Sequence, residues 1–337
     1  MHADLVPPED AEQRPAEERA AAPWRTEHDV VSTLTRLGHP VTPLGVRSDL
    51  GVIGAALQEV RPQIAFNLLE EFDGRAIWDH NVVSYLEMMR TPYTGCNPRG
   101  LMLSRDKALS KQILAYHRVP VPDFAVYPIG RPARRAPRRL RYPLFVKSLV
   151  EEASLGIAQA SIVEDDARLA ERVAFIHDRI GTDALVEQYI EGRELYVGVL
   201  GNRRLMVLPV WELLFTRMPD DVPRIATRKV KWDPAYQKKR GIVSRAAADL
   251  PPGAAEGIAR LARRIYRILG LTGCARIDLR LDAAGRLWVL EANPNPQLAR
   301  GEDFADSAAA AGLPYEELLQ RLLTLGLRRG AAFAAPA

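Results

Sequence analysis

Residues 273–297, GCARIDLRLDAAGRLWVLEANPNPQ, constrain the fold more than any other stretch of the chain. Charged and aliphatic residues alternate before the DAAG turn, and the apolar run after the turn ends in prolines. A period of two places the charged side chains on one face of a strand and the aliphatic ones on the other. If the turn is centred between Ala283 and Ala284, Glu291 lies opposite Arg276, with Asp278 on the diagonal. The pattern therefore predicts a β-hairpin with one polar and one buried face.

The polar face of this hairpin would bring together two carboxylates, one amide and one guanidinium, from Asp278, Glu291, Asn293 and Arg276. Mg²⁺ prefers oxygen ligands, and is usually held by one or two carboxylates together with substrate phosphates. The alternative is a half-exposed hairpin whose charges face water. The ending LEANPNP favours a site, because an acid and an amide at the end of a strand are where α/β folds commonly bind ligands.

Length, charge and cysteine content exclude several classes of function. The 337 residues allow two or three compact modules, and the net charge of +4 is too small to indicate nucleic acid as the main partner. The two cysteines, Cys96 and Cys274, have no metal-ligand spacing, and the six histidines form no zinc motif. The sequence contains neither an apolar run of membrane-spanning length nor a secretory signal. We therefore expect a cytoplasmic protein with no membrane partner.

The first hundred residues alternate between predicted strands and helices. They comprise a short strand in HADLVP, a helix over 26–37, a strand over 39–46, a helix over 50–60 and a strand over 63–69. This order predicts a βαβαβ module. Three acids after its last strand, Glu70, Glu71 and Asp73, would lie where open α/β sheets bind ligands. Ordinary solvated loop charges are the alternative.

Two lysines occupy positions that local structure disfavours. Lys107 lies in the first turn of a helix predicted over 104–118, with Ser104 as its N-cap, where the helix dipole opposes a cation. Lys147 lies within the apolar strand YPLFVKSL, where a buried cation requires an anionic partner. Both lysines are candidates for binding a phosphate. The alternatives are a tolerated surface lysine at position 107, and an ion pair of Lys147 with Glu151 or Glu152.

The remaining segments supply loops and closing helices. Six arginines in residues 131–141 indicate a solvated loop, with a polyanion contact as the alternative. Residues 217–250 predict a long surface loop, and loops of that length are usually functional or disordered. Helices are expected over 165–180 and 256–270, and two more close the chain before a frayed tail at 328–337.

The order of these motifs resembles the ATP-grasp ligases, most closely the D-alanine–D-alanine ligases and their relatives. DKxxxK on a helix is followed by VKS on a strand, a small-residue loop, VEQYIEGRE, a lysine in a loop, RIDLRLD and LEANPNP. The resemblance implies an α/β fold of the α+β ATP-grasp type. An N-terminal βαβ module at 1–100 would precede two α+β subdomains, at 101–186 and 187–327, that sandwich ATP. It also favours a homodimer.

The resemblance implies a role for each motif residue. The residues implied to contact ATP are Lys107, Lys147, Ser154, Gly156, Glu187, Gln188, Ile190 and Glu194. Lys231 would contact the γ-phosphate, and Arg276 would stabilise the oxyanion of the reacting acyl group. Two Mg²⁺ ions, with Mn²⁺ as an alternative, would be held by Asp278, Glu291 and Asn293.

The departures from the family pattern concern the substrates. The family's paired serines correspond here to Ala153 and Ser154, its loop aromatic to Trp232, and its GMTxxS segment to residues 296–303. The sequence therefore predicts an ATP-dependent carboxylate–amine ligase that acts through an acyl phosphate, releases ADP and phosphate, and uses an amino acid or small peptide other than D-alanine. The candidate substrate contacts are Glu70, Glu71, Asp73, His80 and Arg300.

Several alternatives stay open at this point. They are a D-alanine–D-alanine ligase proper, a catalytically silent nucleotide-binding regulator, and a polyanion-binding protein that uses residues 131–141. A nicotinamide enzyme is poorly supported, because no GxGxxG follows a predicted strand.

Overall fold

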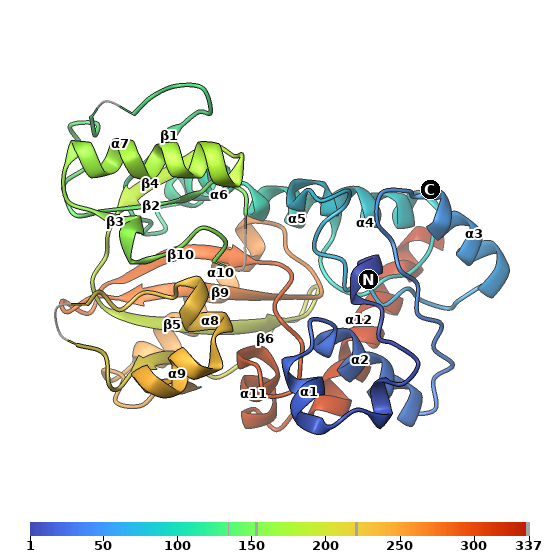
Figure 1. Cartoon of the computed structure of the whole chain (residues 1–337). Helices are drawn as coiled ribbons and strands as arrows, with labels where there is room; N and C mark the ends of the chain where they lie inside the picture. The colour runs from blue at the N-terminus through green and yellow to red at the C-terminus, as the bar shows by residue number, and fades with distance from the viewer. Residues whose placement is uncertain (134, 152–153, 220–221, 335–337) are drawn as a thin grey trace.

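Two antiparallel sheets form the centre of the fold, in a computed structural model that describes residues 1–133, 135–151, 154–219 and 222–334. The smaller sheet has the order β1–β4–β2–β3, and the larger has the order β10–β9–β5–β7–β8, with β6 beside β5. Figure 1 shows the smaller sheet above the larger one, with α7 above the smaller sheet. The strands are β1 Phe124–Tyr127, β2 Leu144–Ser148, β3 Ile162–Val163, β4 Ala184–Gln188, β5 Arg193–Leu200, β6 Met206–Val207, β7 Trp211–Phe215, β8 Ile242–Ala246, β9 Cys274–Leu281 and β10 Leu287–Asn293. Mixed helices and antiparallel sheets confirm the predicted α+β class.

The helices cover these sheets and build the N-terminal part of the molecule. They are α1 Ala16–Ala21, α2 Arg25–Arg36, α3 Gly51–Val60, α4 Asp79–Met88, α5 Pro98–Arg105, α6 Lys107–Tyr116, α7 Asp166–Phe175, α8 Arg228–Trp232, α9 Pro234–Arg240, α10 Ala254–Ile268, α11 Asp303–Ala310 and α12 Tyr315–Ala334. The C-terminal helix α12 lies among the N-terminal helices in Figure 1. In the described part of the chain, no helix combines the length and apolarity needed to cross a membrane.

Three apolar clusters hold these layers together. Leu169 and Val173 of α7 pack with strand residues of the smaller sheet. Ile258 and Ile265 of α10 pack with the apolar face of the larger sheet, which includes Ile277. A third cluster joins α2, α11 and α12. The apolar face predicted for the hairpin is therefore buried, which leaves its polar face to point toward the smaller sheet.

The N-terminal segments that were predicted as strands do not form regular strands, so this prediction is wrong. HADLVP contains a 3-10 helix, Ala3–Leu5, and its pairing with the next segment is a single parallel bridge between His2 and Val46. Residues 63–69 likewise form one parallel bridge, from Ala65 to Tyr93. Prolines within 39–46 and at position 62 lack the N–H that a continuous ladder needs. The predicted helices over 26–37 and 50–60 are present as α2 and α3, and a further helix, α4, follows them.

The helix predicted over 104–118 begins later than expected. Ser104 is a buried residue of α5, so its prediction as an N-cap is wrong. Asp106 caps α6 instead, and its side chain accepts hydrogen bonds from the N–H groups of Ala108 and Leu109. An aspartate at this position satisfies N–H groups that the first helical turn leaves unpaired. Lys107 is thereby fixed as the first residue of α6.

The prediction of a structureless loop over 217–250 is also wrong. The segment forms α8, α9 and β8, and β8 pairs with β7 along the edge of the larger sheet. Thr227 and Asp233 cap the two helices by accepting from the N–H groups of Val230 and Tyr236. The helices are short, so their sequence period is too brief to separate them from a polar loop.

The end of the chain is ordered further than predicted. The α12 helix continues to Ala334, so the expected frayed tail from residue 328 is helical as far as that residue. Arg329 fastens it by donating to the carbonyl oxygens of Tyr93 and Gly95 at 2.8 Å each. The predicted domain boundaries at 100 and 186 fall inside α5 and β4, and the division into domains stays a prediction.

Candidate active site

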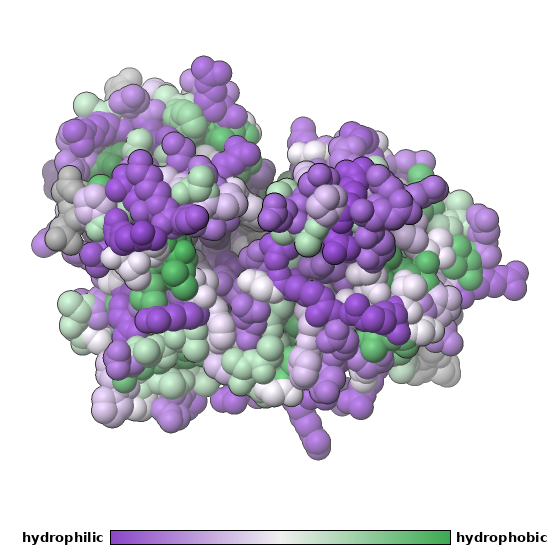
Figure 2. Space-filling view, turned by 60° about the horizontal axis from the view of Figure 1, so that its bottom comes forward, coloured by the Kyte–Doolittle hydropathy of each residue, from purple (hydrophilic) through white to green (hydrophobic). Residues whose placement is uncertain are grey.

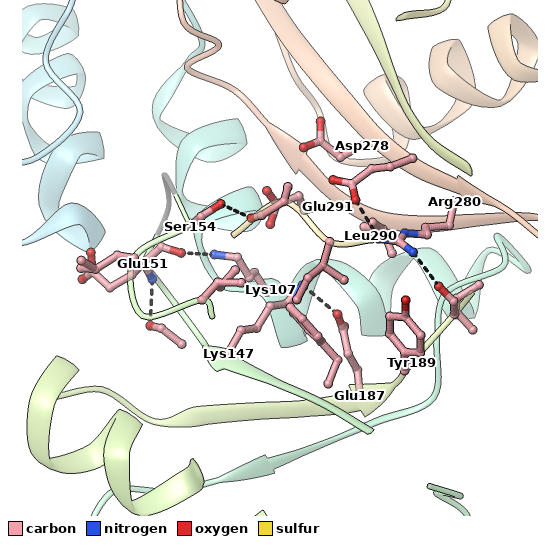
Figure 3. A pocket seen from close by; sticks show the side chains of 18 of the residues that line it. Lys107, Lys147, Glu151, Ser154, Glu187, Tyr189, Asp278, Arg280, Leu290 and Glu291 are labelled. Carbon is pink, nitrogen blue, oxygen red and sulfur yellow. Dashed lines mark hydrogen bonds and ion pairs between the residues drawn. The ribbon is translucent and has the colours of Figure 1, made fainter. Parts of the chain in front are cut away.

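A cavity lies between the two sheets, and residues from both sheets line it (Figure 3). The lining residues that the sequence predicted are Lys107, Lys147, Ser154, Glu187, Gln188, Ile190, Glu194, Lys231, Asp278 and Glu291. Gly156, Arg276 and Asn293 are not among the lining residues. Gly156 follows the lining residue Leu155, and Arg276 and Asn293 lie on the strands that bear Asp278 and Glu291. In the space-filling view a recess separates two parts of the molecule, and its rim is mostly hydrophilic (Figure 2). We call the space between the sheets the first cavity.

A β-bulge at Leu290 determines which carboxylates face this cavity. Val289 pairs with Leu279, but Glu291 pairs with Asp278 and Asn293 with Arg276, so one extra residue is inserted between Val289 and Glu291. Without that insertion Glu291 would pair with Ile277, whose side chain lies in the apolar core. The predicted register, with Glu291 opposite Arg276, is therefore wrong. The bulge gives a closer pair of acids than the sequence suggested.

Asp278 is buried and Glu291 is partly buried, and both lie beside several cations. Arg276 donates to both oxygens of Asp278, at 2.7 and 2.8 Å, and its guanidinium lies 4.5 Å from the centre of the Tyr196 ring. Burial raises the pKa of Asp278, and the charge of Glu291 adds to the shift. Burial alone would also raise the pKa of Glu291, but Lys107, Lys147 and Lys231, followed by Arg276, lower it to about 2. Glu291 is therefore held in its charged form.

These residues fit a divalent cation that arrives with phosphates. Two carboxylates on neighbouring strands face one cavity. Burial and the charge of Glu291 raise the pKa of Asp278, and a divalent ion would stabilise both carboxylates in their charged form. Among the described residues there is no group of three His, Cys, Asp or Glu side chains that could hold a metal alone. The side-chain oxygen of Asn293 accepts the N–H of Asn295 at 2.8 Å, which fixes the amide next to the acids. Such a donor set suits Mg²⁺ completed by substrate phosphates.

The lysines on the opposite wall are held by a buried carboxylate and a carbonyl. Glu187 forms ion pairs with Lys147 at 2.8 Å and with Lys111 at 3.1 Å, and all three side chains are at least nine-tenths buried. Burial alone would lower the pKa of Lys147, but Glu187 and Glu291 raise it, so this ammonium stays charged. Lys107 donates to the carbonyl oxygen of Glu151 at 2.6 Å. The alternative pairing of Lys147 with Glu151 is not found, and Glu152 lies outside the described residues.

A second buried pair closes the far end of the first cavity. Arg280 donates to Glu194 at 2.7 Å, to the carbonyl oxygen of Arg224 at 2.8 Å and to that of Ile190 at 3.1 Å. The other oxygen of Glu194 accepts the hydroxyl of Tyr196 at 2.9 Å. Arg280 therefore connects three segments: β5 through Glu194, the connection before β5 through Ile190, and the segment before α8 through Arg224.

Two loops meet above the first cavity and close it. Ser154 donates to the carbonyl oxygen of Ala226 at 2.7 Å, Gln159 donates to that of Pro223 at 3.2 Å, and the N–H of Arg228 donates to Ile157 at 3.2 Å. The carbonyl oxygen of Gly156 accepts from Arg172 of α7. Ala153, part of the predicted substrate loop, lies outside the described residues. The space that remains measures about 90 Å³, which is smaller than the several hundred cubic ångströms of typical ligand pockets, so a nucleotide needs more room than this arrangement of the loops leaves.

A second, larger cavity adjoins the first. Glu151 and Leu155 line both, and the second cavity has a volume of about 630 Å³. Two predicted substrate residues, Glu70 and Glu71, line it, together with Trp232. Asp73 and His80 line neither cavity: the N–H of Asp73 donates to Arg47, and the His80 ring contacts the carbonyl oxygen of Ile77 at 2.8 Å.

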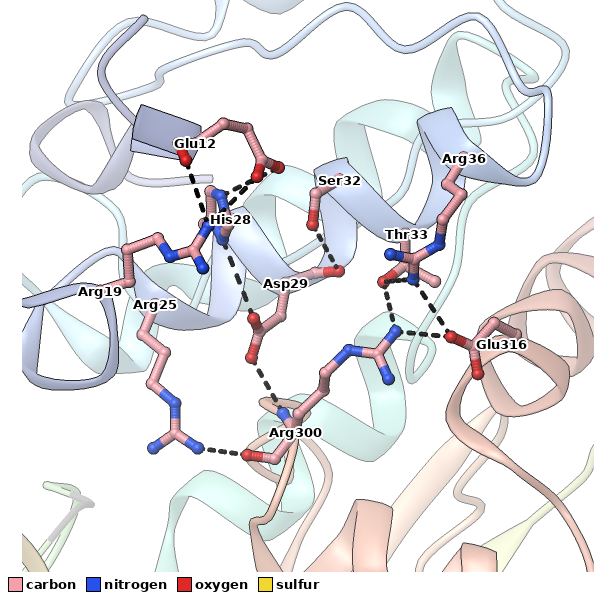
Figure 4. Close-up of polar contacts among 10 residues, drawn as sticks. All are labelled: Glu12, Arg19, Arg25, His28, Asp29, Ser32, Thr33, Arg36, Arg300 and Glu316. Carbon is pink, nitrogen blue, oxygen red and sulfur yellow. Dashed lines mark hydrogen bonds and ion pairs between the residues drawn. The ribbon is translucent and has the colours of Figure 1, made fainter. Parts of the chain in front are cut away.

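Arg300 lies in a network between helices rather than in either cavity (Figure 4). Its guanidinium donates to Thr33 of α2 at 2.9 Å and to Glu316 of α12 at 2.7 Å, and its backbone N–H donates to Asp29 at 3.0 Å. The side chain also covers the Tyr315 ring at 4.2 Å. These contacts favour a structural role for Arg300 over the predicted contact with substrate.

Sequence reasoning missed several residues of the site. Lys111 is the second lysine of the DKxxxK motif, one helical turn after Lys107, but the motif predicts no role for it. Arg280 and Tyr196 were hidden because strand pairing with Glu194 and Asp278 is not visible in the sequence. Glu27 of α2 lines the second cavity although it is only 4 % exposed. The local sequence offered no signal for it, because nothing in TEHDVV distinguishes a buried glutamate from a solvated one.

A family model, related sequences and solved structures all match this chain. The family model described as the D-alanine–D-alanine ligase C-terminus matches residues 130–324. An uncharacterised protein of Sinorhizobium fredii, y4sG, is 32 % identical, covering 91 % of this chain and 90 % of its own length. A D-alanine–D-alanine ligase of Desulforudis audaxviator is 32 % identical, covering 90 % of this chain and 94 % of its own. The fold is similar to that of a Bacillus anthracis D-alanine–D-alanine ligase crystallised with ATP, with a TM-score of 0.70, 21 % identity and coverage of 91 % and 92 % of the two chains.

Proposed function

The chain belongs to the D-alanine–D-alanine ligase family, of the ATP-grasp fold, and from this premise we propose that it joins a carboxylate to an amine through an acyl phosphate at the expense of ATP. As a family member it is an ATP-dependent carboxylate–amine ligase. The observation that supports the acyl-phosphate route is the pairing of Asp278 with Glu291 across a cavity from Lys107 and Lys147. Carboxylates that hold a metal, and cations that face them, are what a triphosphate requires.

The residues of the first cavity would bind ATP in the following way. Lys107 and Lys147 would neutralise phosphate charge, beneath the loop that contains Ser154 and Gly156. The connection at Glu187, Gln188 and Ile190 would take the adenine, and Glu194 would bind the ribose hydroxyls. Because Glu187 already pairs with Lys147 and Lys111, its function in this arrangement is to hold the two ammonium groups in place.

The reaction needs little covalent chemistry from the protein. A carboxylate oxygen of the donor substrate attacks the γ-phosphorus, the bond to ADP breaks, and the acyl phosphate forms. The amine then attacks the acyl carbon, phosphate leaves, and the amine loses a proton. Mg²⁺ held by Asp278, Glu291 and Asn293 would neutralise charge on the phosphates. Lys231 would contact the γ-phosphate, and Arg276 would stabilise the acyl oxyanion.

Exclusion of water is a requirement of this route, because an acyl phosphate hydrolyses readily. The two loops that meet at Ser154 and Ala226 already close the first cavity. They are the natural lids for the reaction.

The substrates are proposed to be amino acids or small peptides other than D-alanine. The segment 296–303 lacks the family's GMTxxS pattern, and Arg300 within it is engaged by Thr33 and Glu316. The named relatives favour the second candidate, a D-alanine–D-alanine ligase proper. We also propose a homodimer, which sedimentation would test.

An ADP-release assay with ATP, Mg²⁺ and panels of D- and L-amino acids tests the function. We expect ADP to appear only with competent pairs of substrates. Strong turnover confined to D-alanine would overturn the substrate proposal and establish the second candidate. Absence of ADP with every pair, in a protein shown to be folded, would contradict the ligase itself.

A further inference from the structure

Tyr196 is a buried side chain beside the site that the proposed mechanism leaves without a role. It lies in β5, where Leu195 and Val197 belong to the apolar core, so alternation along the strand directs Tyr196 to the opposite face. On that face it pairs with Asp278 of β9. The side chain is 3 % exposed and lines neither cavity, so it can influence the reaction only through a neighbour.

The face of the Tyr196 ring supports the guanidinium of Arg276. The residue of β5 directly opposite Arg276 is Gly198, which has no side chain to pack against it. Tyr196 lies two residues before Gly198 on the same face, and its ring centre is 4.5 Å from the guanidinium carbon of Arg276. Diagonal neighbours in a sheet are within reach of aromatic side chains. Stacking of a guanidinium on a ring that is withdrawn from water fixes the plane of the guanidinium.

The contacts on the edge and on the face of Arg276 leave one nitrogen for the reaction. Its Nε and Nη2 atoms donate to the two oxygens of Asp278, at 2.7 and 2.8 Å. Its Nη1 atom has no hydrogen-bond acceptor in the part of the chain that the structure describes, and the carboxylate of Asp303 lies 3.9 Å from it. Asp278 fixes the edge of the guanidinium and Tyr196 covers its face, so Nη1 is the donor left for an acyl oxygen.

The Tyr196 ring is itself held in place by its hydroxyl. Burial raises the pKa of Tyr196 well above its usual range, so the phenol stays protonated and donates to Glu194 at 2.9 Å. Arg280 holds the other oxygen of Glu194 at 2.7 Å. Movement of the ring away from Arg276 would therefore break a buried hydrogen bond, which is costly.

Resting on the ligase function proposed above, we propose that Tyr196 is a positioning residue, which holds Nη1 of Arg276 toward the acyl oxygen while the amine attacks. Negative charge develops on that oxygen only in the transition state, so a preorganised donor there changes the rate of amide formation rather than the binding of ATP. Tyr196 touches no reacting atom and acts through Arg276.

Two variants separate the ring from its hydroxyl. The assay is the single-turnover rate constant of amide formation, with ATP, Mg²⁺ and the pair of amino acids that releases most ADP from the wild type. Tyr196→Phe keeps the ring, and its rate constant should stay close to that of the wild type. Tyr196→Met removes the ring, and its rate constant should fall about 10-fold. Because both variants lack the hydroxyl that Glu194 accepts, the KM for ATP should be the same in the two.

Tyr93 supplies a matched control. It is buried, its ring centre lies 4.0 Å from the guanidinium of Arg329, and its hydroxyl donates to Glu87 at 2.7 Å, but it lines neither cavity. Tyr93→Met should lower the stability, as Tyr196→Met does, and leave the rate constant unchanged. An equal fall of the rate constant in Tyr93→Met would show that loss of any buried ring is sufficient, and would overturn the proposal.

A double-mutant cycle shows whether Tyr196 acts through Arg276. Arg276→Ala should itself lower the rate constant by about 100-fold or more, as loss of one oxyanion donor does. In that background Tyr196→Met should have no further effect relative to Tyr196→Phe, because the group that the ring positions is gone. A fall of about 10-fold in both backgrounds would show that the two residues act independently, and would overturn the proposal. Tyr196→Leu answers the same question if Tyr196→Met does not fold.

Failure of this inference is distinguishable from failure of the ligase proposal. A folded wild type that forms neither amide nor ADP with any pair contradicts the ligase, and the inference falls with it. Turnover by the wild type together with an undiminished rate constant in Tyr196→Met contradicts the role of Tyr196 alone and supports the ligase.

Discussion

At the scale of single residues, Glu187 connects the stability of the site with its charge. Its buried carboxylate forms ion pairs with both Lys111 and Lys147. Burial alone would raise the pKa of Glu187, but the two ammonium groups lower it. One side chain thus keeps two cations on the wall that faces Asp278 and Glu291.

Removal of that carboxylate should destabilise the protein strongly. Glu187→Gln leaves two buried ammonium groups without their counter-charge, and we expect the free energy of unfolding in urea to fall by about 3–5 kcal/mol. The double variant Lys111→Met/Glu187→Gln should recover part of this loss. A change below about 1 kcal/mol for Glu187→Gln would show that the triad does not stabilise the fold.

Glu291 should give the stability a specific dependence on pH. Its pKa is lowered from the usual 4.5 to about 2 in the folded chain, so its contribution is fully present above pH 4.5 and is lost as pH falls from 4.5 toward 2. The shift corresponds to up to about 3 kcal/mol. Urea unfolding of wild type and Glu291→Gln at a series of pH values should show a difference that shrinks with acidification in that window. A difference independent of pH would contradict the environment described for Glu291.

At the scale of elements, the sequence predicted the hairpin because its period of two is uninterrupted over β9. It could not predict the bulge, since nothing around Leu290 distinguishes a bulged residue from a paired one. The pairing of Glu291 with Asp278 therefore became visible only in the structure. The roles of Lys107, Lys147, Asp278 and Glu291 remain proposals, although all four line one cavity.

Other elements escaped the sequence for physical reasons. The α8 and α9 helices span five and seven residues, too few for a helical period to show. Conversely, the apolar runs of the N-terminal module predicted strands, but prolines reduced their pairing to single bridges. Pattern identifies long amphipathic elements well, whereas bulges and bridges depend on partners that are distant in sequence.

The contact between the two lids should limit nucleotide entry. Gln159 donates to the carbonyl oxygen of Pro223 and does not line the first cavity, so Gln159→Ala weakens the closed arrangement without removing a nucleotide contact. A net hydrogen bond contributes about 0.5–1.5 kcal/mol, so the association rate constant of a fluorescent ATP analogue should rise about 2- to 10-fold. Stopped-flow measurement checks this, with the exposed Gln13→Ala as control. An unchanged rate constant would show that this contact does not gate the cavity.

At the scale of the whole molecule, the N- and C-terminal helices form one unit. Arg300 bridges Thr33 of α2 and Glu316 of α12, and Arg25 of α2 donates to the carbonyl oxygen of Arg300 (Figure 4). Arg25 also pairs with Glu302 at 3.1 Å. The segment that follows β10 is thereby fixed against the helix that bears Glu27. The geometry of the second cavity depends on this association.

Arg300→Met tests whether this residue is structural. The variant loses two hydrogen bonds at partly exposed positions, and we expect the free energy of unfolding to fall by about 1–2 kcal/mol. The KM for the amino acid substrates should change less than 2-fold, a limit set by the absence of Arg300 from both cavities. A KM raised 10-fold or more, with stability unchanged, would instead support the contact with substrate that the sequence predicted.

The most direct test of the account is the stoichiometry of ATP use by the whole enzyme. With a competent substrate pair and Mg²⁺, ³¹P NMR and amide quantification should show one ADP and one phosphate for each amide formed. Asp278→Asn, which removes one of the two facing carboxylates while the fold measured by circular dichroism is retained, should reduce kcat/KM by at least about 100-fold. Formation of AMP and pyrophosphate, or full activity of the Asp278→Asn variant, would contradict the account.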